Sequence, residues 1–284
     1  MKKIGFVDFF IDEAHANRYP GLIREGIFKG AFDVHLAWAE ITKKGGKTLE
    51  TWCAEQKVGR ASSIEQVIEE CDCIVVLSPD NPEKHEDLAD LPLKSGKPVY
   101  IDKPIAPTLK AAERIFEKAR KHGTPMMSSS ALRFSSEFKN AREKIGDKSV
   151  RFVATRGPGS FGVYAIHQLE MLVPVLGTGA KKVLQCGNEA SKVMAIDYGD
   201  GRRGVVNLTA GQPFQMTVQF GDKEGLVAND LNDYFPRFVE AMLSFFDSGK
   251  SAVPDCQTLE IAALIEAGNE ALTKPDTWIN VPSR

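Results

Sequence analysis

Cysteine is scarce in this sequence, and long apolar runs and a strong net charge are absent. Five cysteines lie among 284 residues without regular spacing, so we expect reduced core thiols rather than a disulfide framework. No apolar segment approaches the roughly 18 residues that a membrane span needs, which predicts a cytoplasmic protein without a membrane partner. The net charge of -2 provides no field that would attract nucleic acid.

The length of the chain favours two domains. Single hydrophobic cores stop growing near about 250 residues, and this chain has 284. The residue pattern changes near residue 125, which predicts a first domain over residues 1–124 and a second over residues 125–284. No internal repeat or low-complexity linker separates the two halves.

The first half alternates short apolar runs with amphipathic stretches, which is typical of βαβ units around a parallel sheet. Strands are expected over residues 4–10, 34–40, 73–77 and 98–101. Helical spacing is present in residues 48–56, 63–70, 81–94 and 109–122. Right-handed crossovers between such strands give a doubly wound, Rossmann-like α/β sheet.

The second half favours an α+β domain with a mostly antiparallel sheet. Runs rich in β-branched residues are separated by turn residues, and Asp200-Gly201 is a strong hairpin turn. Strands are expected over residues 126–130, 150–155, 183–187, 192–198, 204–210, 214–220 and 224–227. Helices are expected over residues 136–145, 234–248 and 259–272.

Lys103 stands where a strand of the first half ends, and Pro104 prevents a helix from starting there. Open α/β sheets bind ligands outside the carboxyl ends of their strands. A lysine at this place is therefore a candidate catalytic residue that faces a cleft. The alternative is an ordinary surface lysine at a strand exit.

The first strand-to-helix turn lacks the G-x-G-x-x-G pattern that lets a backbone approach a pyrophosphate. Asp8, Phe9, Phe10 and Asp12 fill the places of the glycines. Asp12 is predicted to cap the following helix, and Glu13 to complement its dipole. An alternative is a divalent metal held by carboxylates and an imidazole. The candidate ligands for that alternative are Asp8, Asp12, Glu13 and His15.

Polar residues follow two further strands. Glu40 closes the second strand, where an acidic residue could accept hydrogen bonds from the ribose of a dinucleotide, although such a glutamate is often simply solvated. Ser78, Pro79 and Asn81 follow the third strand and predict a loop facing the same crevice as Lys103, or else a plain turn.

His167 and Glu170 lie three residues apart in a helical segment of the second half, on one face. A histidine oriented by a carboxylate can act as a general acid or base. The alternative is a partly buried histidine that is satisfied by its neighbours.

Several segments resemble the glucose-fructose oxidoreductase, inositol dehydrogenase and rhizopine catabolism family, known as Gfo/Idh/MocA, over nearly the whole chain. Residues 78–81 with His85 resemble its T-P-N-x-x-H loop, and residues 96–106 resemble its G-K-x-V-x-x-E-K-P-x-A segment. His167 with Glu170 resembles its H-x-x-D helix, residues 220–225 resemble its G-x-x-G turn, and the last helix before Val281 also fits.

This resemblance implies an NAD- or NADP-dependent oxidoreductase that acts on a hydroxyl of a sugar, cyclitol or related polyol. It implies a homo-oligomer, such as a dimer, through the C-terminal sheet. Lys103 would orient substrate and cofactor, and His167 would accept the hydroxyl proton. Arg133 would lie at the mouth of the cleft. The implied cofactor contacts are Glu40, Ser78, Pro79, Asn81 and Lys103, and the implied substrate contacts are Arg133, Glu170 and His15.

Two departures from the family pattern keep a second hypothesis open. The glycine-rich turn is missing, and Val163 stands four residues before His167, where the family often has an aspartate. A valine side chain can neither move a proton nor hold a sugar hydroxyl. The alternative function is a non-redox sugar-binding or regulatory protein that keeps the fold without binding a dinucleotide.

Overall fold

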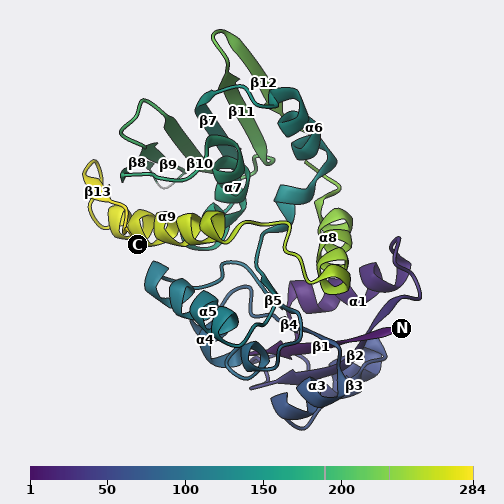
Figure 1. The fold of residues 1–284 in the computed structure, drawn as a ribbon. Helices are drawn as coiled ribbons and strands as arrows, with labels where there is room; N and C mark the ends of the chain where they lie inside the picture. The colour runs from purple at the N-terminus through teal and green to yellow at the C-terminus, as the bar shows by residue number, and fades with distance from the viewer. Residues whose placement is uncertain (189, 230, 284) are drawn as a thin grey trace. The chain divides into compact units, whose positions relative to one another are not determined.

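A computed structural model of the chain describes residues 1–188, 190–229 and 231–283. The chain forms two compact units, and each is described by itself (Figure 1). The first unit comprises Met1–Ala106, Lys110–Ser129 and Val239–Val253. The second comprises Pro107–Leu109, Ser130–Phe238 and Pro254–Arg284, of which Arg284 and residues 189 and 230 are not described.

A six-stranded parallel sheet in the order β3-β2-β1-β4-β5-β6 forms the centre of the first unit. Its strands are β1 (Lys2–Asp8), β2 (Phe32–Ala39), β3 (Gly59–Arg60), β4 (Cys73–Val76), β5 (Val99–Ile101) and β6 (Met126–Met127). Every residue of β4 is buried, as expected for a central strand with both faces covered. The α/β prediction for this half is confirmed.

Helices cover this sheet on both faces, and Figure 1 shows α1 and α3 on opposite sides of the strands. The helices are α1 (Ala14–Glu25), α2 (Leu49–Gln56), α3 (Ile64–Glu70), α4 (His85–Leu88) and α5 (Leu109–Lys121). The packing of α3 requires glycine on β1, because a Cβ at Gly5 would overlap Cγ1 of Val67. The strand order reverses between β1 and β4, which defines a topological switch point.

Three features of the first unit differ from the predictions. The helix expected over residues 81–94 is broken into the 3-10 turns η1 (Pro82–Lys84) and η2 (Pro92–Lys94) around the short α4, because prolines interrupt its hydrogen bonding. The strand expected over residues 126–130 is shorter and pairs with β5, so it belongs to the parallel sheet. The short edge strand β3 was not predicted.

A seven-stranded sheet in the order β12-β11-β7-β10-β9-β8-β13 forms the second unit. Its strands are β7 (Val150–Gly157), β8 (Lys182–Asn188), β9 (Ser191–Asp197), β10 (Arg203–Thr209), β11 (Gln215–Phe220), β12 (Glu224–Ala228) and β13 (Trp278–Asn280). β7 and β10 are parallel, and the other strand pairs that the structure describes are antiparallel. The prediction of a mostly antiparallel sheet is confirmed, although β13 was missed.

Two helices cover one face of this sheet: α7 (Phe161–Leu176) packs on β7 and β10, and α9 (Asp255–Leu272) packs on β8 and β13. The buried residues alternate along β7 and β10, with Val153 and Val206 toward the helices. The remaining elements are the 3-10 turn η3 (Ala131–Phe134), α6 (Ser136–Ile145) and α8 (Tyr234–Ser248). α8 begins in the second unit and ends in the first.

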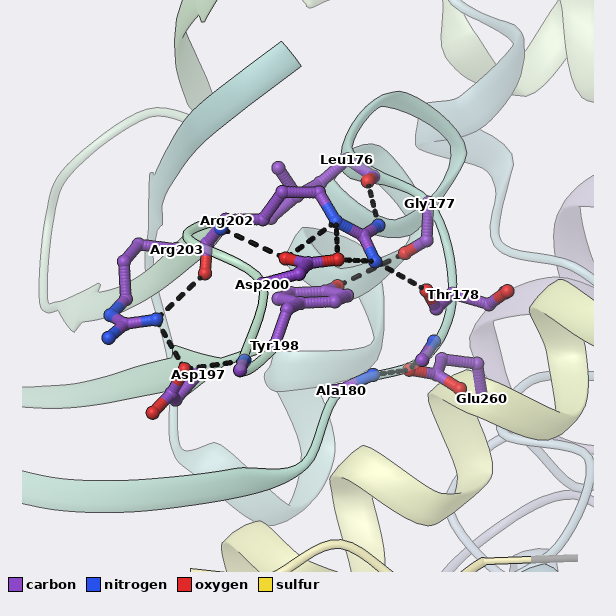
Figure 2. A network of polar contacts seen from close by, with 12 residues as sticks. Leu176, Gly177, Thr178, Ala180, Asp197, Tyr198, Asp200, Arg202, Arg203 and Glu260 are labelled. Carbon is purple, nitrogen blue, oxygen red and sulfur yellow. Dashed lines mark hydrogen bonds and ion pairs between the residues drawn. The ribbon is translucent and has the colours of Figure 1, made fainter. Parts of the chain in front are cut away.

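A polar network holds the end of α7 against the β9–β10 hairpin (Figure 2). The Arg202 guanidinium donates to the carbonyl oxygens of Leu176 at 2.7 Å and Thr178 at 3.2 Å, and it lies over the Tyr198 ring. These carbonyls lack partners within the helix, and a cation there also complements the helix dipole. From α9, Glu260 accepts from the backbone amide of Ala180 at 2.7 Å.

The two units differ from the predicted domain boundary in the assignment of β6 and of Val239–Val253. The two predicted domains, residues 1–124 and 125–284, therefore stay a prediction. Cys53, Cys71 and Cys73 are buried as expected, whereas Cys256 is exposed and is not a core thiol. Among the helices that the structure describes, none is both long and apolar enough to cross a bilayer.

Candidate functional site

The switch point of the first unit is bridged by two buried side chains. Asp8 ends β1 and Ser78 follows β4, and the Ser78 hydroxyl donates to Oδ1 of Asp8 at 2.8 Å. The same hydroxyl accepts from the Phe9 amide at 2.9 Å. Burial raises the pKa of Asp8, and the Ser78 hydrogen bond offsets part of the rise. Oδ2 of Asp8 has no hydrogen-bond partner within the described part of the chain.

The amino terminus of α1 holds a carboxylate from the chain itself. Glu13 is the N-cap residue, and its carboxylate accepts from the backbone amides of His15 and Ala16. The prediction that Asp12 caps this helix was wrong: Asp12 instead accepts from the Lys47 amide at 2.9 Å and from Asn17 at 3.1 Å. The first amides of α1 are therefore already bound to a carboxyl group of the chain.

A buried Asp-His pair joins α1 to the end of β5. Nδ1 of His15 lies 2.5 Å from Oδ2 of Asp102, and the His15 ring stacks on Tyr19 at 5.2 Å. The other carboxylate oxygen accepts from the Tyr100 hydroxyl at 3.1 Å and from the Lys103 amide at 2.7 Å. Burial by itself raises the pKa of Asp102, but the charge and hydrogen bond of His15 bring it down to about 2.

Lys103 lies at the carboxyl edge of the sheet, as predicted, and its side chain is buried. Its Nζ atom donates to the carbonyl oxygen of Pro79, at 3.4 Å, in the loop after β4. His85 supports the loop that follows, because its Nδ1 donates to the Ile105 carbonyl at 3.1 Å. Burial lowers the pKa of His85, which favours the neutral ring.

The other predicted cofactor contacts lie at the same edge of the first unit. Glu40 follows β2, is exposed, and pairs with Nζ of Lys84 at 3.2 Å. Asn81 lies directly before η1 and donates to Glu83 at 2.9 Å. Their roles toward a cofactor stay predictions.

In the second unit, α7 presents His167, which is partly exposed. Its Nδ1 lies 2.7 Å from the Ser130 hydroxyl, and its ring meets Tyr164 and Phe214 edge to face. This geometry fixes the orientation of the imidazole, as a general base requires. Val163, also on α7, is 40% exposed.

Arg133 and Glu170 form a buried ion pair. Nε of Arg133 lies 2.5 Å from Oε2 of Glu170, with side chains 5% and 2% exposed. Nη1 of Arg133 donates to Gln257 at 2.5 Å. Glu170 is thus an ion-pair partner of Arg133, and its predicted role in orienting His167 stays a prediction. Their predicted contacts with substrate stay predictions.

Asp102, Tyr100 and Ser130 were not predicted from the sequence as site residues. Asp102 and Tyr100 belong to the run that ends in Lys103, so a strand end with an acid next to a lysine was the available signal. Nothing local marks Ser130 as a neighbour of a histidine 37 residues away.

The metal hypothesis for Asp8, Asp12, Glu13 and His15 has no support in the geometry. Within residues 1–188, 190–229 and 231–283, no group of three or more His, Cys, Asp or Glu side chains is placed to hold a metal ion. Glu13 and Asp12 already accept backbone amides, and His15 is paired with Asp102.

Comparison with known families matches residues 28–130 to the Gfo/Idh/MocA family, described as an oxidoreductase family with an NAD-binding Rossmann fold. This match includes β2, β4, β5 and the Lys103 segment. It begins after the first strand-to-helix turn, which is the part of the sequence that departs from the family pattern.

Two curated relatives have uncharacterised functions. The chain is 25% identical over 189 residues to protein y4oX of Sinorhizobium fredii, covering 56% of this chain and 52% of that one. It is 27% identical over 157 residues to the oxidoreductase YhhX of Escherichia coli, covering 49% and 46%. The chain thus spans about half the length of the curated relatives it matches.

The fold of the whole chain resembles solved dehydrogenase structures. One is scyllo-inositol dehydrogenase from Lactobacillus casei, solved with bound NAD(H) and scyllo-inositol. The TM-score is 0.82 at 15% sequence identity, and 99% of each chain is covered. Residues 28–130 thus match the Gfo/Idh/MocA family, and the whole chain shares the fold of these dehydrogenases.

Proposed function

We propose that this chain is an NAD(P)-dependent oxidoreductase that acts on a hydroxyl group of a sugar, cyclitol or related polyol. The observation that carries the proposal is the carboxyl edge of the parallel sheet, where Lys103 is buried and the adjacent Asp102 pairs with His15 of α1. Open α/β sheets bind dinucleotides at this edge. The L. casei relative binds NAD(H) and scyllo-inositol on the same fold.

The residues at this edge fit a dinucleotide on one condition. The Glu13 carboxyl group stands in for a ligand of the His15 and Ala16 amides, which supports the binding of a phosphate oxygen there once Glu13 leaves. Glu40 would accept hydrogen bonds from a ribose diol. Because a carboxylate repels a 2′-phosphate, Glu40 supports NAD over NADP.

A bound nicotinamide supplies hydride transfer, and the side chains supply position and proton handling. Lys103 would hold the substrate oxygen and favour its developing negative charge. His167 would accept the hydroxyl proton at Nε2 while Ser130 fixes the ring through Nδ1. Arg133 would hold Glu170 in place, and His15 would hold Asp102 in place.

The test is a reduction assay with purified protein, NAD⁺ or NADP⁺, and a panel of scyllo-inositol, myo-inositol and glucose. We expect reduced cofactor with at least one polyol and a loss of turnover in Lys103→Ala. Lys110→Ala, which removes an exposed lysine, is the matched control. The proposal is refuted if neither NAD⁺ nor NADP⁺ is reduced with any polyol and the protein does not bind NADH at millimolar concentration.

We also propose a homo-oligomer formed through the face of the seven-stranded sheet opposite α7 and α9. One row of directly paired residues crosses this face and is mostly apolar. Its members are Val227, Thr217, Ala154, Val205, Ala195, Leu184 and Trp278. Val227 and Trp278 are 58% and 42% exposed. The proposed partners are thus the cofactor, the polyol and a second copy of the chain. The proposed location is the cytoplasm, because it contains NAD(H).

One observation favours the second candidate function, a sugar-binding or regulatory protein without redox chemistry. Asp8 and Glu13 place carboxyl groups where a dinucleotide would bring its pyrophosphate, and their ionised forms repel it. This candidate predicts calorimetric binding of scyllo-inositol in the absence of cofactor, with no effect of added NADH.

A further inference from the structure

Glu13 is the N-cap residue of α1, and its side chain occupies the backbone amides that an external anion would bind. Its carboxylate is 5% exposed and accepts from the amides of His15, at 2.7 Å, and Ala16. The backbone groups of Glu13 are also hydrogen-bonded. Its amide donates to the Ile11 carbonyl at 2.9 Å, and its carbonyl accepts from the Asn17 amide at 3.0 Å. The first turn of α1 therefore has an internal ligand.

A dinucleotide on this fold would need the same donors. In doubly wound sheets the pyrophosphate lies at the amino terminus of the helix after the first strand, where free amides and the helix dipole attract it. An amide hydrogen that is donated to Glu13 is not available to a phosphate oxygen. Two anions on one pair of donors also repel each other.

We propose that Glu13 is an internal competitor of the cofactor, so that a dinucleotide binds only when the Glu13 side chain leaves the α1 amides. This inference rests on the proposed function, because it assumes that the chain binds NAD(H). It adds a self-inhibitory contact that the cofactor must displace, and the contact is made by a residue of the turn that lacks glycines.

The surroundings of Glu13 couple this displacement to protonation. Asp8 on β1 and Asp102 after β5 face it with negative charge, and His15 and Tyr19 on α1 are the other titratable groups near it. Burial raises the pKa of Glu13 to about 8, and the charge of Asp8 adds to the rise. A protonated Glu13 is a weaker acceptor for the amides and does not repel a phosphate.

The binding of NADH should accordingly depend on pH. Affinity should fall as the pH rises from 7 to 9, by up to about tenfold per pH unit above the Glu13 pKa if one proton is taken up per NADH. Glu13→Gln should remove most of this dependence, because a neutral amide side chain competes weakly and carries no charge. Glu13→Gly should do the same, since glycine is tolerated at an N-cap.

The experiment is a fluorescence titration of NADH into the full chain at pH 7, 8 and 9. The variants are Glu13→Gln, Glu13→Gly and Asp8→Asn. The control is Glu25→Gln, which makes the same charge change at the exposed carboxyl end of α1. We expect both Glu13 variants to bind NADH at least about tenfold tighter than wild type at pH 9, with Glu25→Gln unchanged. Thermal unfolding checks that each variant is folded.

Three results would overturn the proposal in distinguishable ways. If wild type binds NADH and the folded Glu13 variants bind it equally or more weakly, the competition is refuted and the proposed function stands. Persistence of the pH dependence in Glu13→Gln, with loss in Asp8→Asn, refutes it as well. If no protein in the set binds NADH at millimolar concentration, the proposed function and the competition both fail.

Discussion

Nδ1 of His15 lies 2.5 Å from Oδ2 of Asp102, and the Asp102 side chain is fully buried. The pair connects the first turn of α1 to the end of β5, so the two elements at the candidate site share one buried charge interaction. An aspartate in this environment keeps its charge only because a donor and a counter-charge are held against it.

Replacing His15 by asparagine should therefore cost about 3 kcal/mol in the free energy of unfolding, because it leaves Asp102 buried without its counter-charge. Adding Asp102→Asn should recover part of that loss. The control is His35→Asn, since His35 faces Glu70 at 3.8 Å with both side chains partly exposed. We expect a change below about 0.5 kcal/mol there. Urea unfolding measures all four proteins, and equal losses for His15 and His35 would contradict the prediction.

Asp8 and Glu13 should make the protein less stable as the pH rises. Burial raises the pKa of both carboxyl groups in the folded state, so the folded state retains protons that the unfolded chain releases. The free energy of unfolding should thus fall between about pH 5 and pH 8. Asp102, whose pKa is lowered to about 2, contributes the opposite slope only at more acidic pH.

Urea unfolding from pH 5 to pH 9 checks this, with Asp8→Asn as the variant. Asp8→Asn should flatten the decline, whereas Asp80→Asn, at an exposed position, should leave it unchanged. If the free energy of unfolding of the wild type instead increases steadily over this range, the pKa values of Asp8 and Glu13 are not raised in the folded state.

The Arg133-Glu170 pair should be a strong, structurally required interaction. Arg133→Met removes the guanidinium from a carboxylate whose side chain is 2% exposed, which should cost about 3 kcal/mol in unfolding free energy. The double variant with Glu170→Met should regain much of it. The exposed pair Lys139-Glu143, at 3.8 Å, should show a coupling below about 0.5 kcal/mol in the same double-mutant cycle. Similar couplings for both pairs would disprove the expectation.

If His167 is the general base, His167→Asn should lower kcat by about 10² to 10⁴ while NADH still binds. Ser130→Ala should lower kcat less and move the pH profile, because the hydroxyl that fixes Nδ1 is lost. His122→Asn, which changes an exposed histidine, should have wild-type kinetics. An active His167→Asn enzyme would assign the proton transfer to another residue.

Val205 lies in the middle of the paired row on the open sheet face, between Ala154 and Ala195. Val205→Arg should therefore shift the proposed oligomer toward monomer, because an unpaired charge would be buried at the interface. Val163→Arg, at an exposed position on α7, is the control. Light scattering that finds the same mass for wild type and Val205→Arg would argue against this face.

Much of the fold could be predicted from local pattern. The apolar runs of β1, β4 and β5 and the β-branched runs of the second half fall close to the observed strands, because strand periodicity is a local property. β3 and β13 were missed because strands of two and three residues carry too little pattern. The helix expected over residues 81–94 is broken because Pro82 and Pro92 interrupt the hydrogen bonding that helical spacing alone allows.

Lys103 and His167 could be picked out from sequence because a strand-end lysine and a helical histidine are recognisable where they stand. Sequence also determined that the first strand-to-helix turn has carboxylates in place of glycines. Which carboxylate does what was decided only by tertiary structure. Glu13 rather than Asp12 caps α1, Asp102 pairs with His15, and Glu170 pairs with Arg133. Such pairings depend on backbone angles and on residues far apart in the chain, such as His15 and Asp102, 87 positions apart, which only strand order and helix packing bring together.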